Sequence, residues 1–271
     1  MLACFTDGPR VGLCAMTASL KIDFVSDVSC PWCAVGLGAL EQALERLQGT
    51  VKADLHFQPF ELNPQMPPGG QDITEHLTEK YGSTPEKQAE IREMIRQRGA
   101  EVGFEFRREG RGRIYNTFDA HRLLLLAENE GQPGQQHALK KALLTAYHGR
   151  AESPESHEVL LRLATEVGLD PARVQAVLAS DELADEVRAQ ELMYQRAGIR
   201  SVPAVVINDR HLISGGQPAE VFEQADDIAE LQSVGDAIYF AESSGSAQGK
   251  VGIKRLDDLG KGLEEQGAAG M

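Results

Sequence analysis

The sequence predicts an α/β fold in two separated halves: a β-α-β unit near the start of the chain and a β-β-α unit near its end, with a block of helices between them. Three observations support this prediction. Alternating apolar residues flank one amphipathic helix, a long central stretch is rich in helix-capping residues, and a β-branched run precedes a turn. The chain has 271 residues, 42% of them hydrophobic, which suffices for a sizeable core.

The first half begins with a strand in which apolar residues alternate with charged ones and which ends near Ser26. An amphipathic helix follows and ends at Gly49, and alternation then predicts a second strand. Strand, helix and strand follow one another with the length of a βαβ unit, so we expect the two strands to be parallel. The residues that carry these patterns are Leu20, Ile22 and Phe24, then Leu37, Leu40, Leu44 and Leu47, then Val51, Ala53, Leu55 and Phe57.

The stretch from Leu62 to about Gly198 is predicted to hold five to seven helices. Three positions have a capping residue followed by proline, which is typical of a helix start. They are Thr84-Pro85, Ser153-Pro154 and Asp170-Pro171, and further helices are predicted over Asp119–Glu130, Gln135–His148 and Asp181–Ala197.

The second half consists of a β-branched run from Val202 to Ile207, a turn, a short strand from His211 to Ser214 and a helix from about Pro218 to Ile228. This is the order of a thioredoxin fold with a helical insertion. We therefore expect a thioredoxin-like domain in two parts, with the tail weakly ordered or docked as one short helix. The predicted ranges are a flexible leader at 1–18, the thioredoxin-like parts at 19–61 and 199–232, the helical insertion at 62–198 and the tail at 233–271.

Composition excludes several classes of partner. A net charge of −14 repels phosphate backbones and anionic lipid surfaces, so nucleic acid and membranes are not expected partners. No apolar run approaches the length of a transmembrane helix, and Asp7, Pro9 and Arg10 interrupt the apolar stretch that a signal peptide needs. We expect a cytoplasmic protein that binds no metal, and the sequence leaves a homodimer open.

Two of the four cysteines form the motif Cys30-Pro31-Trp32-Cys33 at the turn from the first strand into the first helix. The helix N-terminus favours negative charge at Cys30, which makes Cys30 the expected nucleophile and Cys33, one turn inside, the resolving thiol. Pro31 supplies the fixed φ angle of a first helical turn, and Trp32 covers the pair. Pro31 and Trp32 are therefore also candidate substrate-binding residues.

A second element is Val202-Pro203. A cis proline facing a CxxC motif exposes the preceding backbone for pairing with an extended peptide or with glutathione. Pro203 is therefore a candidate catalytic residue and Val202 a candidate substrate-binding residue.

Several segments resemble the FrnE branch of the DsbA family. They are Ile22–Asp27, Cys30–Cys33, Pro59–Pro64, Asn116–Leu123 and Ser201–Ala204. The resemblance implies a thioredoxin fold with an inserted helical domain and disulfide oxidoreductase or isomerase activity. It also implies kinship with kappa-class glutathione transferases and 2-hydroxychromene-2-carboxylate isomerases, by which Asn63 and Val202 correspond to glutathione-contacting positions. No cysteine follows Cys33, so a relay from a second cysteine pair is not expected.

Other interpretations compete at single residues. A CxxC can be half of a zinc site, but Cys4, Cys14 and the histidines supply no matching second half. His121 is predicted to be a packed or capping histidine. Asp23 and Asp27 are candidates for the acidic group that moves protons to Cys33, although a solvated carboxylate is favoured at both positions.

The favoured hypothesis is a thiol–disulfide oxidoreductase that acts on protein disulfides. Its expected partners are protein or small-molecule thiols and disulfides, with no bound cofactor and with glutathione as a candidate co-substrate. Reductant, oxidant and isomerase all stay open at this point. The first alternative is a glutathione-dependent transferase or isomerase, in which Cys33 is incidental. The second is a redox-sensing or chaperone-like binding module.

Overall fold

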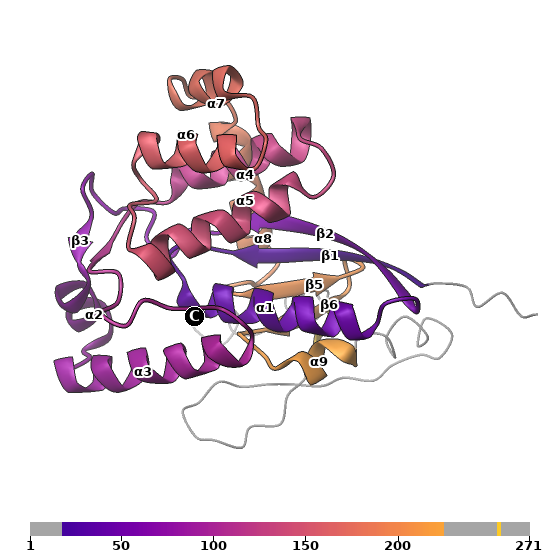
Figure 1. Cartoon of the computed structure of the whole chain (residues 1–271), viewed down its shortest axis with the longest axis horizontal. Coiled ribbons are helices and arrows are strands. Elements are labelled where there is room, and N and C mark those ends of the chain that lie inside the picture. The colour runs from indigo at the N-terminus through magenta and orange to yellow at the C-terminus, as the bar shows by residue number, and fades with distance from the viewer. Residues whose placement is uncertain (1–17, 225–253, 256–271) are drawn as a thin grey trace, which may run out of the picture.

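Residues 18–224 and 254–255 are described by the computed structural model, and they form the predicted two halves around a helical block (Figure 1). A five-stranded sheet has the order β2-β1-β5-β6-β7. In it β1 pairs in parallel with β2 and antiparallel with β5, and β5 pairs antiparallel with β6. The α/β thioredoxin fold is thereby confirmed. The strands are β1 (Ala18–Ser26), β2 (Val51–Pro59), β5 (Ala204–Ile207), β6 (His211–Ser214) and β7 (Lys254–Arg255).

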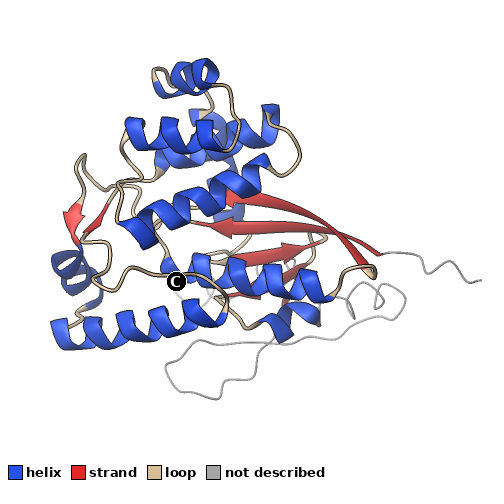
Figure 2. Ribbon diagram, viewed as in Figure 1, coloured by secondary structure: helices blue, strands red, loops and turns tan. Residues whose placement is uncertain are grey.

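Helices cover both faces of this sheet (Figure 2). On one face α1 (Pro31–Arg46) and α9 (Ala219–Glu223) pack against alternate residues of β1, among them Ile22 and Phe24. On the other face the sheet residues Val25 and Val206 pack with Tyr194 of α8 (Ala184–Arg196). Strand β1 therefore lies at the centre of the core, and the loop at its end is fixed from both sides.

The insertion contains seven α-helices between residues 62 and 198, within the predicted number. Helices α4 to α7 stack beyond the β2 edge of the sheet, whereas α2 and α3 lie beside the start of α1 (Figure 1). Among the described residues, no helix has both the length and the apolar character that a bilayer crossing requires. The insertion helices before α8 are α2 (Ile73–Tyr81), α3 (Pro85–Glu101), α4 (Phe118–Glu130), α5 (Gln135–Leu144), α6 (His157–Glu166) and α7 (Pro171–Leu178), and a π-helical turn (Thr145–Gly149) continues α5.

Two of the three predicted helix starts are confirmed, and one is wrong. Thr84 and Asp170 cap α3 and α7, each with its side chain accepting a hydrogen bond from a backbone N–H of the first turn. The start at Ser153-Pro154 is wrong, because residues 153–156 form a turn and α6 is capped by Ser156, whose hydroxyl accepts from the N–H of Val159.

Other boundaries also differ from the predictions. Helix α8 begins at Ala184 instead of Asp181, after Leu183 adopts a positive φ of 65°. The helix predicted to reach Ile228 is helical to Glu223, and residues 225–228 lie outside the described part. In the tail, residues 254–255 pair with β6 as a strand, where the prediction was a weakly ordered stretch or one short helix. Helix α2 and the small β3–β4 sheet (Gln71–Asp72 with Arg113–Ile114) escaped prediction, because α2 buries a single residue, His76.

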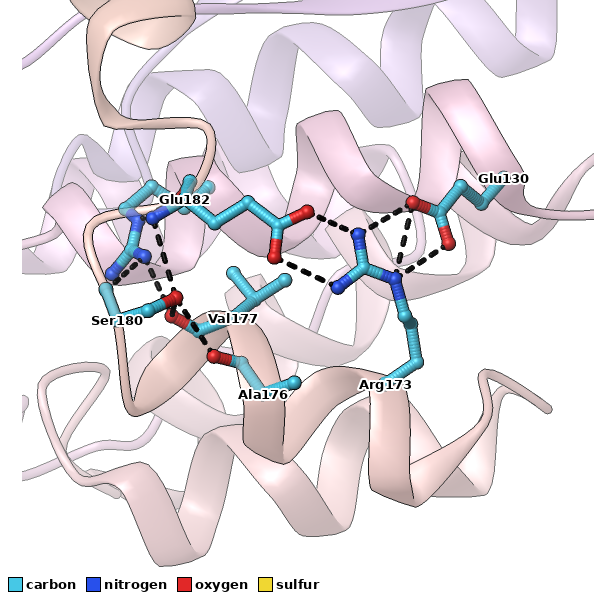
Figure 3. A network of polar contacts seen from close by, with 7 residues as sticks. Glu130, Arg173, Ala176, Val177, Ser180 and Glu182 are labelled. Atoms are coloured by element: carbon cyan, nitrogen blue, oxygen red, sulfur yellow. Dashed lines mark hydrogen bonds and ion pairs between the residues drawn. The ribbon is translucent and has the colours of Figure 1, made fainter.

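Arginine side chains join the helices of the insertion to one another. Arg173 of α7 is paired with Glu130 at the end of α4 and with Glu182 in the following loop (Figure 3). The buried guanidinium of Arg122 donates to the backbone oxygens of Val177 and Glu182, and it thereby satisfies one of the orphan carbonyls at the end of α7. These contacts fix α7 on α4.

Gln136 connects the insertion to the edge of the sheet. Its side chain accepts from the N–H of Phe57 at 2.8 Å and donates to the Phe57 carbonyl at 3.1 Å, as a neighbouring strand would. Gln136 is buried, and its amide also donates to the carbonyl of Leu124 in α4. One side chain therefore satisfies edge-strand polar groups that would otherwise be buried without partners.

Replacing Gln136 with leucine is expected to lower the free energy of unfolding by about 2–4 kcal/mol, because two buried backbone groups of Phe57 lose their partners. Urea denaturation followed by circular dichroism measures this, and the slope of the transition should stay unchanged. The matched control is Gln132→Ala at an exposed site, which should change stability by less than about 0.5 kcal/mol. Equal stability of the two variants would contradict the assigned role of Gln136.

Candidate active site

The cysteine motif lies where β1 turns into α1, as predicted. Cys30 is the N-cap of α1, with φ −88° and ψ 116°, and Pro31 occupies the first helical position. The N–H of Cys33 donates to the Cys30 carbonyl at 3.1 Å. Because the first N–H groups of a helix have no intrahelical acceptors, the Cys30 sulfur lies where negative charge is stabilised.

The two thiols occupy different environments. Cys30 borders a pocket, whereas Cys33 is fully buried behind it, and both are free thiols. The hydrogen bond from Cys33 lowers the pKa of Cys30, and burial raises the pKa of Cys33 well above its ordinary value. The pair is therefore suited to one attacking thiolate and one thiol held in reserve.

The loop before β5 completes the site. The Val202–Pro203 peptide bond is cis, and the Cys30 thiol donates to the Val202 carbonyl at 3.4 Å. Gly36 allows this approach, because a Cβ at that position would lie 3.0 Å from Cγ of Pro203. The structure thus brings together Cys30, Cys33, Val202 and Pro203 from the two separated halves of the fold.

The expectation of solvated carboxylates at Asp23 and Asp27 is wrong, since both side chains are buried. Asp23 lies along β1, where it accepts from Gln58 and pairs with Lys21. Asp27, directly before the motif, accepts four hydrogen bonds. These come from the N–H and hydroxyl of Ser29 at 2.9 and 2.7 Å, the N–H of Leu62 at 2.7 Å and the hydroxyl of Thr117 at 2.8 Å.

Asp27 is held as a carboxylate by these partners. Burial opposes its ionisation, but the neighbouring His121, whose Nε2 lies 3.7 Å from Oδ1, and the backbone donors lower its pKa below its usual range. His121 is buried, as the prediction of a packed histidine requires. A carboxylate with four donors stays ionised at neutral pH, so the structure gives Asp27 an organising role and not a proton-carrying one.

Lys140 and His148 lie near the cysteines and were not predicted. Lys140 of α5 is fully buried, its Nζ has no hydrogen-bond partner, and burial lowers its pKa. The sequence did contain one signal for Lys140. It lies four residues after Gln136 and four before Leu144, on the buried stripe of α5. For His148 no such signal existed, because it lies in the π-helical turn.

A pocket of about 340 Å³ opens beside Cys30, between the cysteine motif and helices α2 and α3. Pro31 and Trp32 line it, and so does Asn63, whose side-chain oxygen accepts from Lys80 Nζ at 2.7 Å. Its walls are mainly apolar, which is typical of a small-molecule site. The candidate substrate-binding residues Pro31, Trp32 and Asn63 therefore share one cavity, while Val202 faces Cys30 from the opposite loop.

Fold and site together define a thioredoxin-fold protein with a paired-cysteine motif at a helix N-terminus. The sequence-family model of the DSBA-like thioredoxin domain matches residues 21–225, and the chain belongs to this family.

The chain is also similar to solved structures and to a curated relative. The structure of a probable DsbA oxidoreductase from Streptomyces coelicolor is 32% identical, with a TM-score of 0.72 over 86% of this chain and 98% of that one. A putative protein disulfide isomerase from Nitrosomonas europaea is 20% identical, with a TM-score of 0.59 over 80% and 100% of the two chains, and shares the fold. The protein YwbO of Bacillus subtilis is 26% identical over 78% of this chain and 96% of its own length.

Replacing Asp27 with asparagine is expected to lower the free energy of unfolding by about 2–4 kcal/mol at pH 7, because an amide nitrogen would face donors that the carboxylate accepts. Since folding depresses the pKa of Asp27, its stabilisation is present above its ordinary value of 3.8 and is lost as the pH falls below it. Urea denaturation from pH 7 to pH 3 should show this acid loss in the wild type and a smaller loss in the variant. The control Asp170→Asn keeps a capping residue and should change stability little.

Replacing Cys33 with alanine is expected to raise the pKa of Cys30, because the hydrogen bond to its thiolate is lost, whereas serine in its place keeps a donor. Alkylation of Cys30 by iodoacetamide at pH 7 should be roughly tenfold slower in Cys33→Ala than in Cys33→Ser. Rates measured by mass spectrometry across pH 5–10 give both pKa values. Identical profiles for the two variants would show that Cys33 does not stabilise the thiolate.

Proposed function

We propose that this protein is a thiol–disulfide oxidoreductase whose working pair is Cys30 and Cys33 and which acts on protein disulfides. One observation carries the proposal: Cys30 caps α1, donates to the Val202 carbonyl at 3.4 Å beside a cis proline, and has the buried Cys33 directly behind it. An attacking sulfur, a place to hold its adduct and a resolving sulfur are thus within one site.

The reaction follows from this arrangement. The Cys30 thiolate attacks one sulfur of a substrate disulfide, forms a mixed disulfide and releases the other half as a thiolate. The Cys33 thiol then gives up its proton, which a released thiolate takes, and attacks the Cys30 sulfur. The second half leaves, the substrate has gained two electrons, and a Cys30–Cys33 disulfide has formed. The same steps in reverse transfer a disulfide to substrate thiols.

The backbone at Val202 is the observation that favours a peptide substrate. Its carbonyl already accepts from Cys30, and residue 202 precedes strand β5, so an extended chain carrying the mixed disulfide can pair there. We place the exchange in a reducing compartment such as the cytoplasm, where paired cysteines are typically catalytic.

A glutathione-dependent transferase or isomerase is the second candidate function. The pocket beside Cys30, with Asn63 on its wall, favours it because a cavity of about 340 Å³ suits a small molecule. In that case glutathione would be a co-substrate and Cys33 would not take part.

A redox titration separates the two candidates. The protein is equilibrated in glutathione buffers of defined ratio, and the Cys30–Cys33 disulfide is quantified by alkylation and mass spectrometry. The oxidoreductase is expected to titrate as one two-electron couple with a midpoint between about −270 and −120 mV. A stable glutathione adduct on Cys30 without a Cys30–Cys33 disulfide would favour the second candidate instead.

Single cysteine variants test the order of attack. The substrate is a test protein whose disulfides have been reduced and then reoxidised. With it the Cys33→Ser variant is expected to accumulate mixed disulfides, since no thiol resolves them. The Cys30→Ser variant should form none, because Cys33 is fully buried. Non-reducing electrophoresis detects the adducts, and equal trapping by both variants would contradict the assignment of Cys30 as the nucleophile.

A further inference from the structure

The pocket beside Cys30 has a charge opposite to that of the whole protein. The chain carries a net charge of −14, yet no aspartate or glutamate lines this cavity. Three arginines line it, namely Arg92, Arg107 and Arg111, together with His76 and His148, two histidines whose pKa values burial lowers, so that their rings are neutral at pH 7. A cavity whose wall carries guanidinium groups and no carboxylate favours an anionic ligand.

Arg111 is held in position at the cavity wall by two side chains of the π-helical turn, His148 and Tyr147. It donates from Nη1 to His148 Nδ1 at 3.0 Å, and Nε2 of the same ring lies 2.9 Å from the Val28 carbonyl. These two contacts assign the proton to Nε2, and burial lowers the pKa of His148 well below its usual value, so the imidazole is neutral. The guanidinium of Arg111 also lies over the ring of Tyr147, with its carbon 5.1 Å from the ring centre.

Arg111 has no carboxylate partner among residues 18–224 and 254–255, and its buried Nε has no hydrogen-bond acceptor. Two other arginines of the insertion differ in this respect. Arg122 pairs with Asp119, and Arg188 pairs with Glu61 and Glu191. A guanidinium that is oriented by neutral groups and left without a counter-ion at a cavity wall is prepared for a carboxylate from outside.

Apolar and aromatic side chains make up most of the remaining wall. They come from all three helices around the cavity, α1, α2 and α3, and from the loop after α3. Trp32, Ile73, Leu77, Ile91, Ile95 and Phe106 are the main contributors. Such walls bind a flat apolar body.

We propose that, in addition to protein disulfides that pair at Val202, this protein takes a small organic disulfide with an aromatic body and a carboxylate, which binds in this pocket with its carboxylate on Arg111 and on Arg92 at the exposed rim. This substrate class rests on the proposed function, because Cys30 at the pocket wall performs the attack. The Cys30 thiolate bonds to one substrate sulfur, the sulfur–sulfur bond breaks, and the other aromatic half leaves as a thiolate with the electron pair.

Two aromatic disulfides of similar size test the proposal. 5,5′-Dithiobis(2-nitrobenzoate) carries a carboxylate on each ring, whereas 2,2′-dithiodipyridine is uncharged at pH 7. Stopped-flow absorbance gives the rate of each with the reduced full-length protein. The ratio of the two rates cancels changes in the intrinsic reactivity of Cys30.

Arg111→Gln is expected to lower this ratio about tenfold, since one charge-assisted hydrogen bond to the carboxylate is lost. Arg92→Gln, at an exposed site, should lower it about two- to threefold. Arg108→Gln removes the same charge next to a pocket residue but does not line the cavity, and it should leave the ratio unchanged.

The outcomes are separable. An unchanged ratio in Arg111→Gln and Arg92→Gln overturns the carboxylate site, and continued reaction with dithiodipyridine then shows that the exchange chemistry survives. An equal loss in Arg108→Gln also overturns it, since the effect is then general electrostatics. If thermal unfolding shows that Arg111→Gln does not fold, the ratio in Arg92→Gln decides. Failure of reduced wild-type protein to react with either probe overturns the proposed function together with this inference.

Discussion

The buried carboxylate of Asp27 is the interaction on which the rest of the site depends. It accepts hydrogen bonds from the loop before α1, from Leu62 after β2 and from Thr117 before α4, which are three segments far apart in the chain. One anion therefore fixes the cysteine loop, the entry into the helical insertion and its central helix in a single geometry. A buried charge is stable only when fully bonded, so these segments hold one another in place.

Charge is arranged differently on the two sides of the cysteine pair. Beneath it lie Asp27, which is fully satisfied, and Lys140, whose Nζ has no hydrogen-bond partner. Beside it the pocket holds cations without acids. The thiol that faces the pocket has the lowered pKa, and the thiol that faces the interior has the raised one. The asymmetry between the cysteines follows from the hydrogen bond that Cys33 gives to Cys30 and from the burial of Cys33.

The strands of the thioredoxin-like halves and the cysteine turn were predictable because their signals are local: alternation along β1, an amphipathic α1 and a proline after Cys30. The Val202–Pro203 loop could be paired with the cysteine motif only because it contains an X–Pro bond at the start of a predicted strand. In contrast, Asp27 looked like any loop carboxylate, since its partners are up to 90 residues away. The pocket was invisible for the same reason, because its wall joins residues of α1, α2, α3 and the loop after α3, which only the tertiary fold brings together.

The way Gln136 meets Phe57 also bears on the exposed edge of the sheet. Strand β2 is an edge of the sheet, and an open edge can pair with a strand of another molecule. Its second half is covered by α4 and α5, through Gln136 and through His56 with Glu128 at 2.5 Å, while exposed Lys52 and Asp54 occupy its first half. Partial opening of the insertion would expose the unpaired backbone groups of β2 to a strand of another molecule, so the helical block also protects this edge against aggregation.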